Sequence, residues 1–169
     1  MRSIPDPGFP DDDGSAPPEL VDALLAYDAD PDGRHDATLA VLQSQRLLVP
    51  VVALLGEVEH DDRGLARDKT SDMATVLMRG RDGRTALLAF TSAETLHRWN
   101  PDARPVPVRA ATAAEAALSD DASAMLVDVA GPVMFVVEGE DLRALAQGQT
   151  LMRLGQEVSG RYAWVRPDR

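Results

Sequence analysis

The sequence predicts an α+β domain in which helices cover a mixed, largely antiparallel sheet of about five or six strands. Segments with strand character come in neighbouring pairs joined by short turns, and helical segments lie between these pairs. This order favours a mixed or antiparallel sheet over a regular alternation of parallel strands and helices. A length of 169 residues with 44% apolar and 4% aromatic residues is typical of one domain with an aliphatic core.

The amino-terminal segment differs in composition from the rest of the chain. The first 18 residues contain five prolines and the acidic run Asp11–Asp13. Such a composition buries too little apolar surface to order itself alone. We therefore predict a flexible, acidic, proline-rich arm over residues 1–17.

Two helices are predicted after the arm. Leu20, Leu24 and Tyr27 recur at helical spacing, and prolines precede the first turn, which predicts an amphipathic helix over residues 19–27. A second helix is predicted to begin near Asp36.

The first strands follow these helices. Residues 47–58 are almost continuously apolar and predict a buried strand, in which Pro50 favours the start of the strand or a sheet edge. Residues 73–79 and 85–91 flank Asp82-Gly83, a dipeptide typical of a type I′ turn. They are therefore predicted to form a β-hairpin.

Two segments have the spacing of a helix capping box, Thr91–Glu94 and Thr112–Glu115. In the first, Thr91 is predicted to be the N-cap, with Glu94 reaching back to it. The segment Pro105–Val108 between them alternates proline and valine, which is typical of an edge strand.

The last elements are predicted from short apolar runs. Residues 124–129 and 133–137 are predicted to be strands, and residues 141–147 a helix that ends at Gly148. Residues 149–169 form a C-terminal extension that could add one strand or hang free.

Composition excludes several classes of function. The chain has no cysteine, so thiol catalysis, disulfides and thiolate metal sites are excluded. The formal net charge of −11 repels the phosphates that dominate nucleic-acid binding, so no nucleic-acid partner is expected. The longest apolar run is far shorter than the ~20 residues of a membrane span, so neither export nor a membrane partner is expected.

Two acidic segments are weak candidates for metal binding. Asp28–Gly33 resembles the start of an EF-hand calcium loop, but Leu39 stands where a bidentate Glu is needed. We favour a solvated loop in which Gly33 ends one helix and Asp36 caps the next. The second segment, residues 57–62, has five potential metal ligands. Successive side chains on a strand point in alternating directions, which would separate these groups. They are Glu57, Glu59, His60, Asp61 and Asp62. No metal site is assigned.

Catalytic and cofactor motifs are absent from the sequence. It contains no nucleophile elbow, phosphate-binding loop or dinucleotide-binding glycine motif, and only three histidines. We therefore expect no catalytic residues, no cofactor and no enzymatic activity.

One polar loop and one tryptophan make up the candidate interaction surface. The loop precedes the predicted hairpin and brings the only lysine together with hydroxyl and carboxylate groups, at Lys69, Thr70, Ser71 and Asp72. Loops on a rigid sheet often carry binding sites, although local turn hydrogen bonds would also explain these residues. Trp99 is an anchor type common at interfaces, although a core position is the first expectation for a lone tryptophan.

Several segments together resemble the actinobacterial branch of the SseB family, the enhanced serine sensitivity proteins. The segments are Leu47-Leu48-Val49-Pro50-Val51-Val52, Lys69-Thr70-Ser71-Asp72-Met73-Ala74-Thr75-Val76-Leu77-Met78, Ala86-Leu87-Leu88-Ala89-Phe90-Thr91-Ser92 with Trp99, and Pro105-Val106-Pro107-Val108. The resemblance covers roughly residues 4–146.

The resemblance implies a cytoplasmic α+β domain, here over residues 18–148, like the SseB N-terminal domain. It implies no established activity, substrate or catalytic residue. Longer family members carry a second domain, and this chain is expected to end after the first. An unrelated secreted virulence translocator shares the name, but this chain lacks the long apolar segments of such a protein.

Two functions remain open from the sequence. The first is a non-enzymatic protein-binding or regulatory module, which presents its polar loop and a sheet edge to a partner or to its own copy. The alternative is a small-molecule or ion-binding protein, for a metabolite linked to serine or a weak calcium site.

Overall fold

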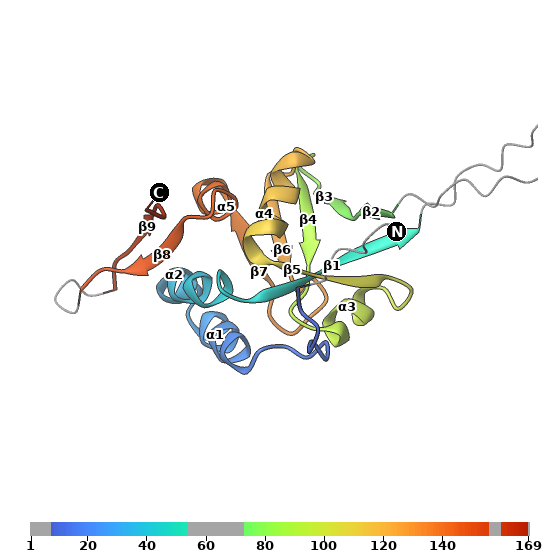
Figure 1. Ribbon diagram of the computed structural model, residues 1–169, viewed down its shortest axis with the longest axis horizontal. Coiled ribbons are helices and arrows are strands. Elements are labelled where there is room, and N and C mark those ends of the chain that lie inside the picture. Colours follow the sequence, from blue (N-terminus) through green and yellow to red (C-terminus); the bar gives the residue numbers. More distant parts are fainter. Residues whose placement is uncertain (1–7, 54–72, 156–159, 169) are drawn as a thin grey trace, which may run out of the picture.

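The computed structural model describes residues 8–53, 73–155 and 160–168. Helices cover both faces of a central sheet, and a small hairpin projects at one end of the molecule (Figure 1). The helices are α1 (Pro18–Ala29), α2 (Pro31–Leu42), α3 (Ala93–Trp99), α4 (Ala110–Ser119) and α5 (Gly139–Ala146). The strands are β1 (Arg46–Ala53), β2 (Met73–Thr75), β3 (Leu77–Arg79), β4 (Thr85–Ala89), β5 (Arg104–Arg109), β6 (Ala124–Val127), β7 (Phe135–Glu138), β8 (Thr150–Arg153) and β9 (Tyr162–Val165). The α+β prediction is confirmed.

The strands of the described residues form three sheets rather than one sheet of five or six strands. Their orders are β2-β1-β5, β3-β4-β6-β7 and β8-β9. A single antiparallel bridge between Leu48 and Phe90, with both N···O distances at 2.8 Å, joins the first two sheets. Strand β1 therefore pairs with β4 at one point and with β2 further along.

Pro50 explains why β1 changes neighbours. It lies between the Leu48–Phe90 bridge and the first β1–β2 pair, Val51–Thr75, where β1 has no partner on that side among the described strands. A missing N–H costs little there. The expectation that Pro50 marks a strand start or a sheet edge is wrong, because β1 is the central strand of its sheet.

The prediction of an edge strand with alternating prolines is confirmed. Among the described strands β5 pairs only with β1, and Pro105 and Pro107 lie opposite Pro50 and Leu48. Two residues without an N–H on one strand block its outer edge against a further strand.

The second sheet is mixed. β4 and β6 are parallel, whereas β3 pairs with β4 and β7 with β6 in the antiparallel sense. The predicted hairpin exists as β3–β4, but its turn is not type I′, since Gly83 has a φ of +83° and Asp82 has no positive φ. A type I′ turn needs positive φ at both central residues. β2, the first part of the predicted hairpin strand, pairs with β1 instead.

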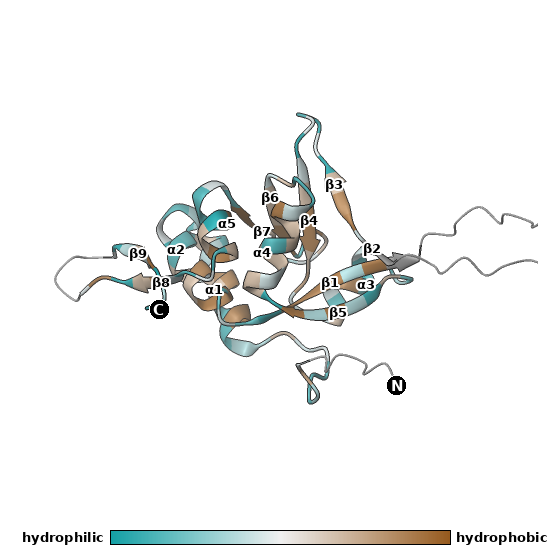
Figure 2. Ribbon diagram, turned by 45° about the horizontal axis from the view of Figure 1, so that its top comes forward, coloured by the Kyte–Doolittle hydropathy of each residue, from teal (hydrophilic) through white to brown (hydrophobic). Residues whose placement is uncertain are grey.

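Helices α1, α2, α4 and α5 cover one face of the second sheet. Leu20, Leu39 and Leu142 from three of these helices are fully or almost fully buried against Leu87 and Phe135 of the sheet. A smaller cluster on the other face contains residues of β1, β4 and α3. Figure 2 shows brown, hydrophobic segments in α1, β1 and β4, which contribute residues to these two clusters.

Three helix starts differ from the predictions. α2 begins at Pro31, because Asp30 accepts the Gly33 N–H at 3.1 Å and proline suits a first helical position. α3 has Ser92 rather than Thr91 as its N-cap, in a capping box with Thr95. α4 already begins at Ala110, so Thr112 lies inside it and caps nothing.

The hairpin β8–β9 is attached to the helices through side chains. The Gln43 side-chain amide accepts the Leu151 N–H at 2.7 Å and donates to the Leu151 carbonyl at 2.9 Å. The Trp164 indole N–H donates to Asp141 at 2.9 Å. Gln43 thus makes the same two hydrogen bonds as a neighbouring strand.

Gln43→Glu is expected to loosen this hairpin. A carboxylate still accepts the Leu151 N–H, but it cannot donate to the Leu151 carbonyl and repels it. Amide hydrogen exchange in residues 150–153 should become faster by more than in the control Gln147→Glu, which adds the same charge at an exposed site nearby. Equal exchange in the two variants would contradict the role of Gln43.

A candidate docking groove beside helix α1

The groove lies where the two parallel strands of the second sheet end. β4 and β6 run in register from Ala86–Ala124 to Ala89–Val127, so the residues that follow them meet at the same edge. These are Thr91, which leads into α3, and Asp128. In open α/β sheets ligands often bind at the carboxyl ends of such strands.

Asp128 is a buried carboxylate held by three donors. It is 3% exposed. Its Oδ1 accepts the Thr91 N–H at 2.8 Å and the Thr95 hydroxyl at 2.7 Å, and its Oδ2 accepts the Thr91 hydroxyl at 2.6 Å. Its backbone has a φ of 56°, a left-handed conformation that Asp tolerates better than most residues. The carboxylate therefore joins the end of β6 to the start of α3.

The hydroxyl groups around Asp128 form a closed network. The Ser92 hydroxyl donates to Thr95 Oγ1 at 3.2 Å, and Ser92 Oγ accepts the Thr95 N–H at 3.1 Å. In the described part of the chain, every fully buried side-chain nitrogen or oxygen has a hydrogen-bond partner. These polar groups are thus occupied within the protein and leave no buried group unpaired for chemistry.

Above this polar floor lies a half-open recess of about 240 Å³. Its apolar walls come from α1 and from the turn after β6, with Val21, Leu24 and Leu25 on one side and Pro132 and Val133 on the other. We call this recess the α1 groove. Val21 and Leu25 are 37% and 55% exposed, so α1 presents apolar side chains to solvent there. Small-molecule pockets usually have about 300–1,000 Å³, so this groove suits a side chain better.

The amino-terminal arm forms one end of the groove. Ala16 lines it, and the Gly14 carbonyl accepts the Ala93 N–H at 2.8 Å. Arg46 is 9% exposed at its side chain and donates to Asp12 at 2.5 Å, to the Ser15 carbonyl at 2.9 Å and to the Thr91 carbonyl at 2.7 Å. Arg46 therefore fixes residues 12–15 of the predicted arm against the end of β4.

The surface of α1 beside the groove carries negative charge. Arg98 donates to Glu94 at 2.6 Å, so these two exposed groups largely neutralise each other. Asp22 and Asp28 lie three residues before and after Leu25 on α1, and both are exposed. Residues at this spacing are neighbours on a helix surface. On the arm, the hydroxyl and backbone N–H of Ser15 hold the pKa of Asp13 below its usual range, which keeps this carboxylate charged.

The structure places only part of the surface predicted from the sequence. Lys69, Thr70, Ser71 and Asp72 lie outside the described residues. Trp99 is partly buried and packs against Phe90, with ring centroids 5.7 Å apart, and it does not line the α1 groove. This position agrees with a packing role for the tryptophan.

The acidic segments considered as metal sites are placed in part. Asp30 caps α2 and Gly33 lies inside that helix, so residues 28–33 do not form the expected loop. Residues 57–62 lie outside the described part of the chain. Among the described residues no three His, Asp or Glu side chains are grouped as metal ligands.

No motif in the sequence indicated the groove. One signal was available, because Asp128 directly follows a buried strand and precedes the Gly131-Pro132 turn. The close approach of this turn was not visible in the sequence. A Cβ on Gly131 would lie 2.9 Å from the Asp128 Cβ and 3.3 Å from the Thr95 side chain.

Asp128→Ala is expected to destabilise the protein by about 2–4 kcal/mol, through three lost hydrogen bonds to a charged acceptor. Asp121→Ala is the matched control, because Asp121 has the same φ of 56° but is exposed. Both variants carry the cost of alanine in a left-handed conformation, so their difference reports the buried carboxylate. Urea unfolding measures it, and similar free energies of unfolding would contradict this role.

Arg46→Ala is expected to release the arm and to lower the free energy of unfolding by about 1.5–3 kcal/mol, since charge-assisted hydrogen bonds are lost. Exchange of the Ala93 amide hydrogen should become faster, because its acceptor is the Gly14 carbonyl. Arg104→Ala, an exposed arginine of β5, should leave both measurements close to the wild type. Unchanged Ala93 exchange in Arg46→Ala would show that the arm is held by other contacts.

Comparison with known proteins gave one match. The family model described as the SseB protein N-terminal domain matches residues 20–144, a range that contains the α1 groove residues other than Ala16 and excludes the β8–β9 hairpin. No curated protein and no solved structure matches the chain. In the described part of the chain, no helix combines the length and apolarity of a membrane span. Because the match covers more than half of its residues, the chain belongs to the SseB family.

Proposed function

We propose that this chain is a non-enzymatic, cytoplasmic protein-binding or regulatory module that docks a partner through the α1 groove. The observation that carries this proposal is the exposure of Val21 and Leu25 beside a recess of side-chain size. Binding interfaces commonly bury such an anchor side chain in a pocket and surround it with polar groups.

The closed polar floor supports binding over catalysis. A general base or nucleophile needs a lone pair or proton that is available to the substrate. The Asp128 oxygens and the hydroxyl of Thr91 are instead engaged with each other and with Thr95. The floor therefore serves to hold the walls of the groove in place.

The groove is also better suited to docking than the outer edges of β5 and β7. Pro105 and Pro107 leave the outer edge of β5 unsuited to pairing with a partner strand. On β7, the His35 side chain lies 3.4 Å from the Val136 carbonyl and approaches that edge from α2. A groove for side chains is thus a better docking surface than these sheet edges.

Cytoplasmic location and assignment to the actinobacterial branch are further parts of the proposal. Their support is the SseB family match and the segments quoted from the sequence. A net charge of −11 also argues against nucleic acid as the partner.

Leu25→Asp tests the groove. In affinity capture from native lysate with quantitative mass spectrometry, a true partner should be recovered by the wild-type protein and reduced at least about tenfold by Leu25→Asp, since burying a charge at an anchor site costs more than 1.4 kcal/mol. Leu118→Asp is the control, because Leu118 is also exposed, at 37%, and lies on α4 away from the groove residues. Proteins lost equally in both variants, or in neither, would count against the groove as the docking site.

A further inference from the structure

The charges around the α1 groove indicate what kind of partner it fits. Helices α1 and α2, with the residue that links them, carry six exposed carboxylates and one arginine, Arg34. The carboxylates are Glu19, Asp22, Asp28, Asp30, Asp32 and Asp36. Glu19, Asp22 and Asp28 lie on α1 itself, which carries no basic residue, so the groove opens beside an acidic helix.

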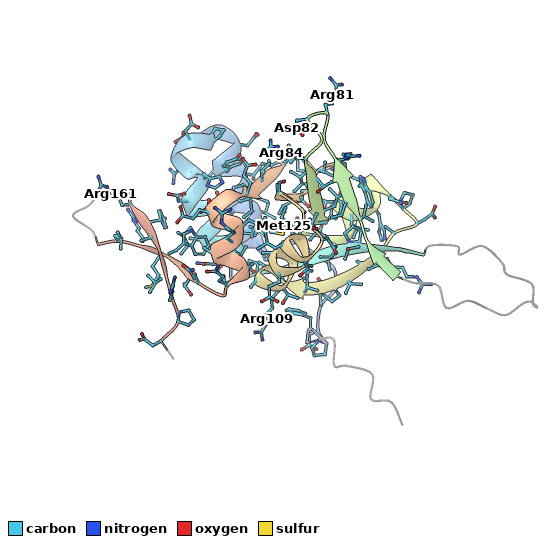
Figure 3. All side chains as sticks on the ribbon, turned by 90° about the horizontal axis from the view of Figure 1, so that it is seen from above. Arg81, Asp82, Arg84, Arg109, Met125 and Arg161 are labelled. Carbon is cyan, nitrogen blue, oxygen red and sulfur yellow. The ribbon has the colours of Figure 1, made fainter. Side chains whose placement is uncertain are left out.

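Several of the described arginines lie on other elements of the molecule. Figure 3 shows Arg81 projecting from the tip of the β3–β4 hairpin, and Arg109 and Arg161 at other edges. At that tip Arg84 pairs with Asp82 at 2.7 Å, and this contact lowers the pKa of Asp82 and raises the pKa of Arg84. On the groove rim Arg98 is likewise paired, with Glu94. Among the described side chains, no arginine or lysine forms such an ion pair with the carboxylates of α1.

We propose that the partner of the α1 groove is a basic polypeptide segment that inserts one aliphatic side chain between Val21, Leu25 and Val133. This inference rests on the proposed function and specifies its partner. The aliphatic side chain would cover the exposed apolar carbons of α1, while Lys or Arg residues on both sides of it would face Asp22 and Asp28. Charge complementarity of this kind sets specificity and accelerates association.

The volume of the α1 groove limits the size of the side chain that can insert into it. A volume of about 240 Å³ accommodates one aliphatic side chain together with part of its backbone. The polar floor contributes orientation rather than affinity, because its hydrogen bonds are already made. Most of the affinity should therefore come from the buried aliphatic group and from the flanking charges.

Three labelled peptides of equal length test the inference by fluorescence polarisation. The first has a central leucine flanked by lysines, the second replaces the leucine by alanine, and the third keeps the leucine but replaces the lysines by glutamates. The first should bind at least about tenfold tighter than either of the others. Its affinity should also fall as salt is added, because exposed charge pairs are screened.

Leu25→Asp separates apolar anchoring from simple charge attraction. It adds a negative charge beside the groove, so a purely electrostatic interaction with the lysine peptide would become stronger. The proposal requires weaker binding, because the aliphatic wall is lost. Leu118→Asp adds the same charge on α4 and should leave the affinity unchanged or slightly raised.

Two further variants test the charges. Asp22→Asn should weaken binding of the lysine peptide. It should leave the difference in affinity between the leucine and alanine peptides unchanged. Arg98→Ala leaves Glu94 without its ion-pair partner on the rim and should therefore strengthen binding of the lysine peptide. If neither variant changes its affinity, the acidic surface does not contribute and the inference is wrong.

The remaining outcomes separate this inference from the proposed function. The proposal of a basic partner would be overturned if the lysine peptide bound Leu25→Asp more tightly than the wild type. It would also be overturned if the glutamate peptide bound as tightly as the lysine peptide. The groove could still be supported by loss of a lysate partner in Leu25→Asp. Sedimentation velocity covers self-association, since a dimer of the wild-type protein that Leu25→Asp abolishes would identify a second copy as the occupant and overturn this inference.

Discussion

The buried carboxylate of Asp128 is the interaction on which the arrangement of this domain depends. It receives three hydrogen bonds from Thr91 and Thr95, and so fixes the start of α3 against the end of β6. A carboxylate this deeply buried is stable only when its lone pairs are occupied. The left-handed backbone at Asp128 and the close approach of Gly131 follow from that requirement. The turn after β6 is thereby placed where it can form a wall of the α1 groove.

The same network decides the character of the groove. Polar groups at the carboxyl ends of parallel strands often receive ligands. Here they are used internally, and Arg46 extends the bonding by linking the Thr91 carbonyl to the arm. What faces the solvent is the apolar side of α1, namely Val21 and Leu25. A rigid polar floor with apolar walls favours recognition of a side chain, which is the basis of the proposed docking function.

The groove is open to a partner, whereas several backbone edges of the sheets are closed to one. β5 carries prolines on its outer edge, so this edge of the first sheet has little free backbone to offer. At the other end of the molecule lies the β8–β9 hairpin (Figure 1). The Gln43 side chain hydrogen-bonds both the N–H and the carbonyl of Leu151 there, as a neighbouring strand would. Side chains thus close backbone positions that would otherwise attract a partner strand.

Local sequence patterns predicted the fold class, a helix over residues 19–27, a hairpin around Asp82-Gly83 and an edge strand at Pro105–Val108, because hydrophobic periodicity, glycine and proline act over short distances along the chain. The sequence also excluded thiol chemistry and disfavoured nucleic acid through composition and charge. The division into separate sheets, the N-cap of α3 at Ser92 and the α1 groove became visible only in the folded protein. These features depend on contacts between residues far apart in the chain, such as Thr91 with Asp128 and Arg46 with Asp12. Local patterns contain no information about which of many polar residues meet in this way.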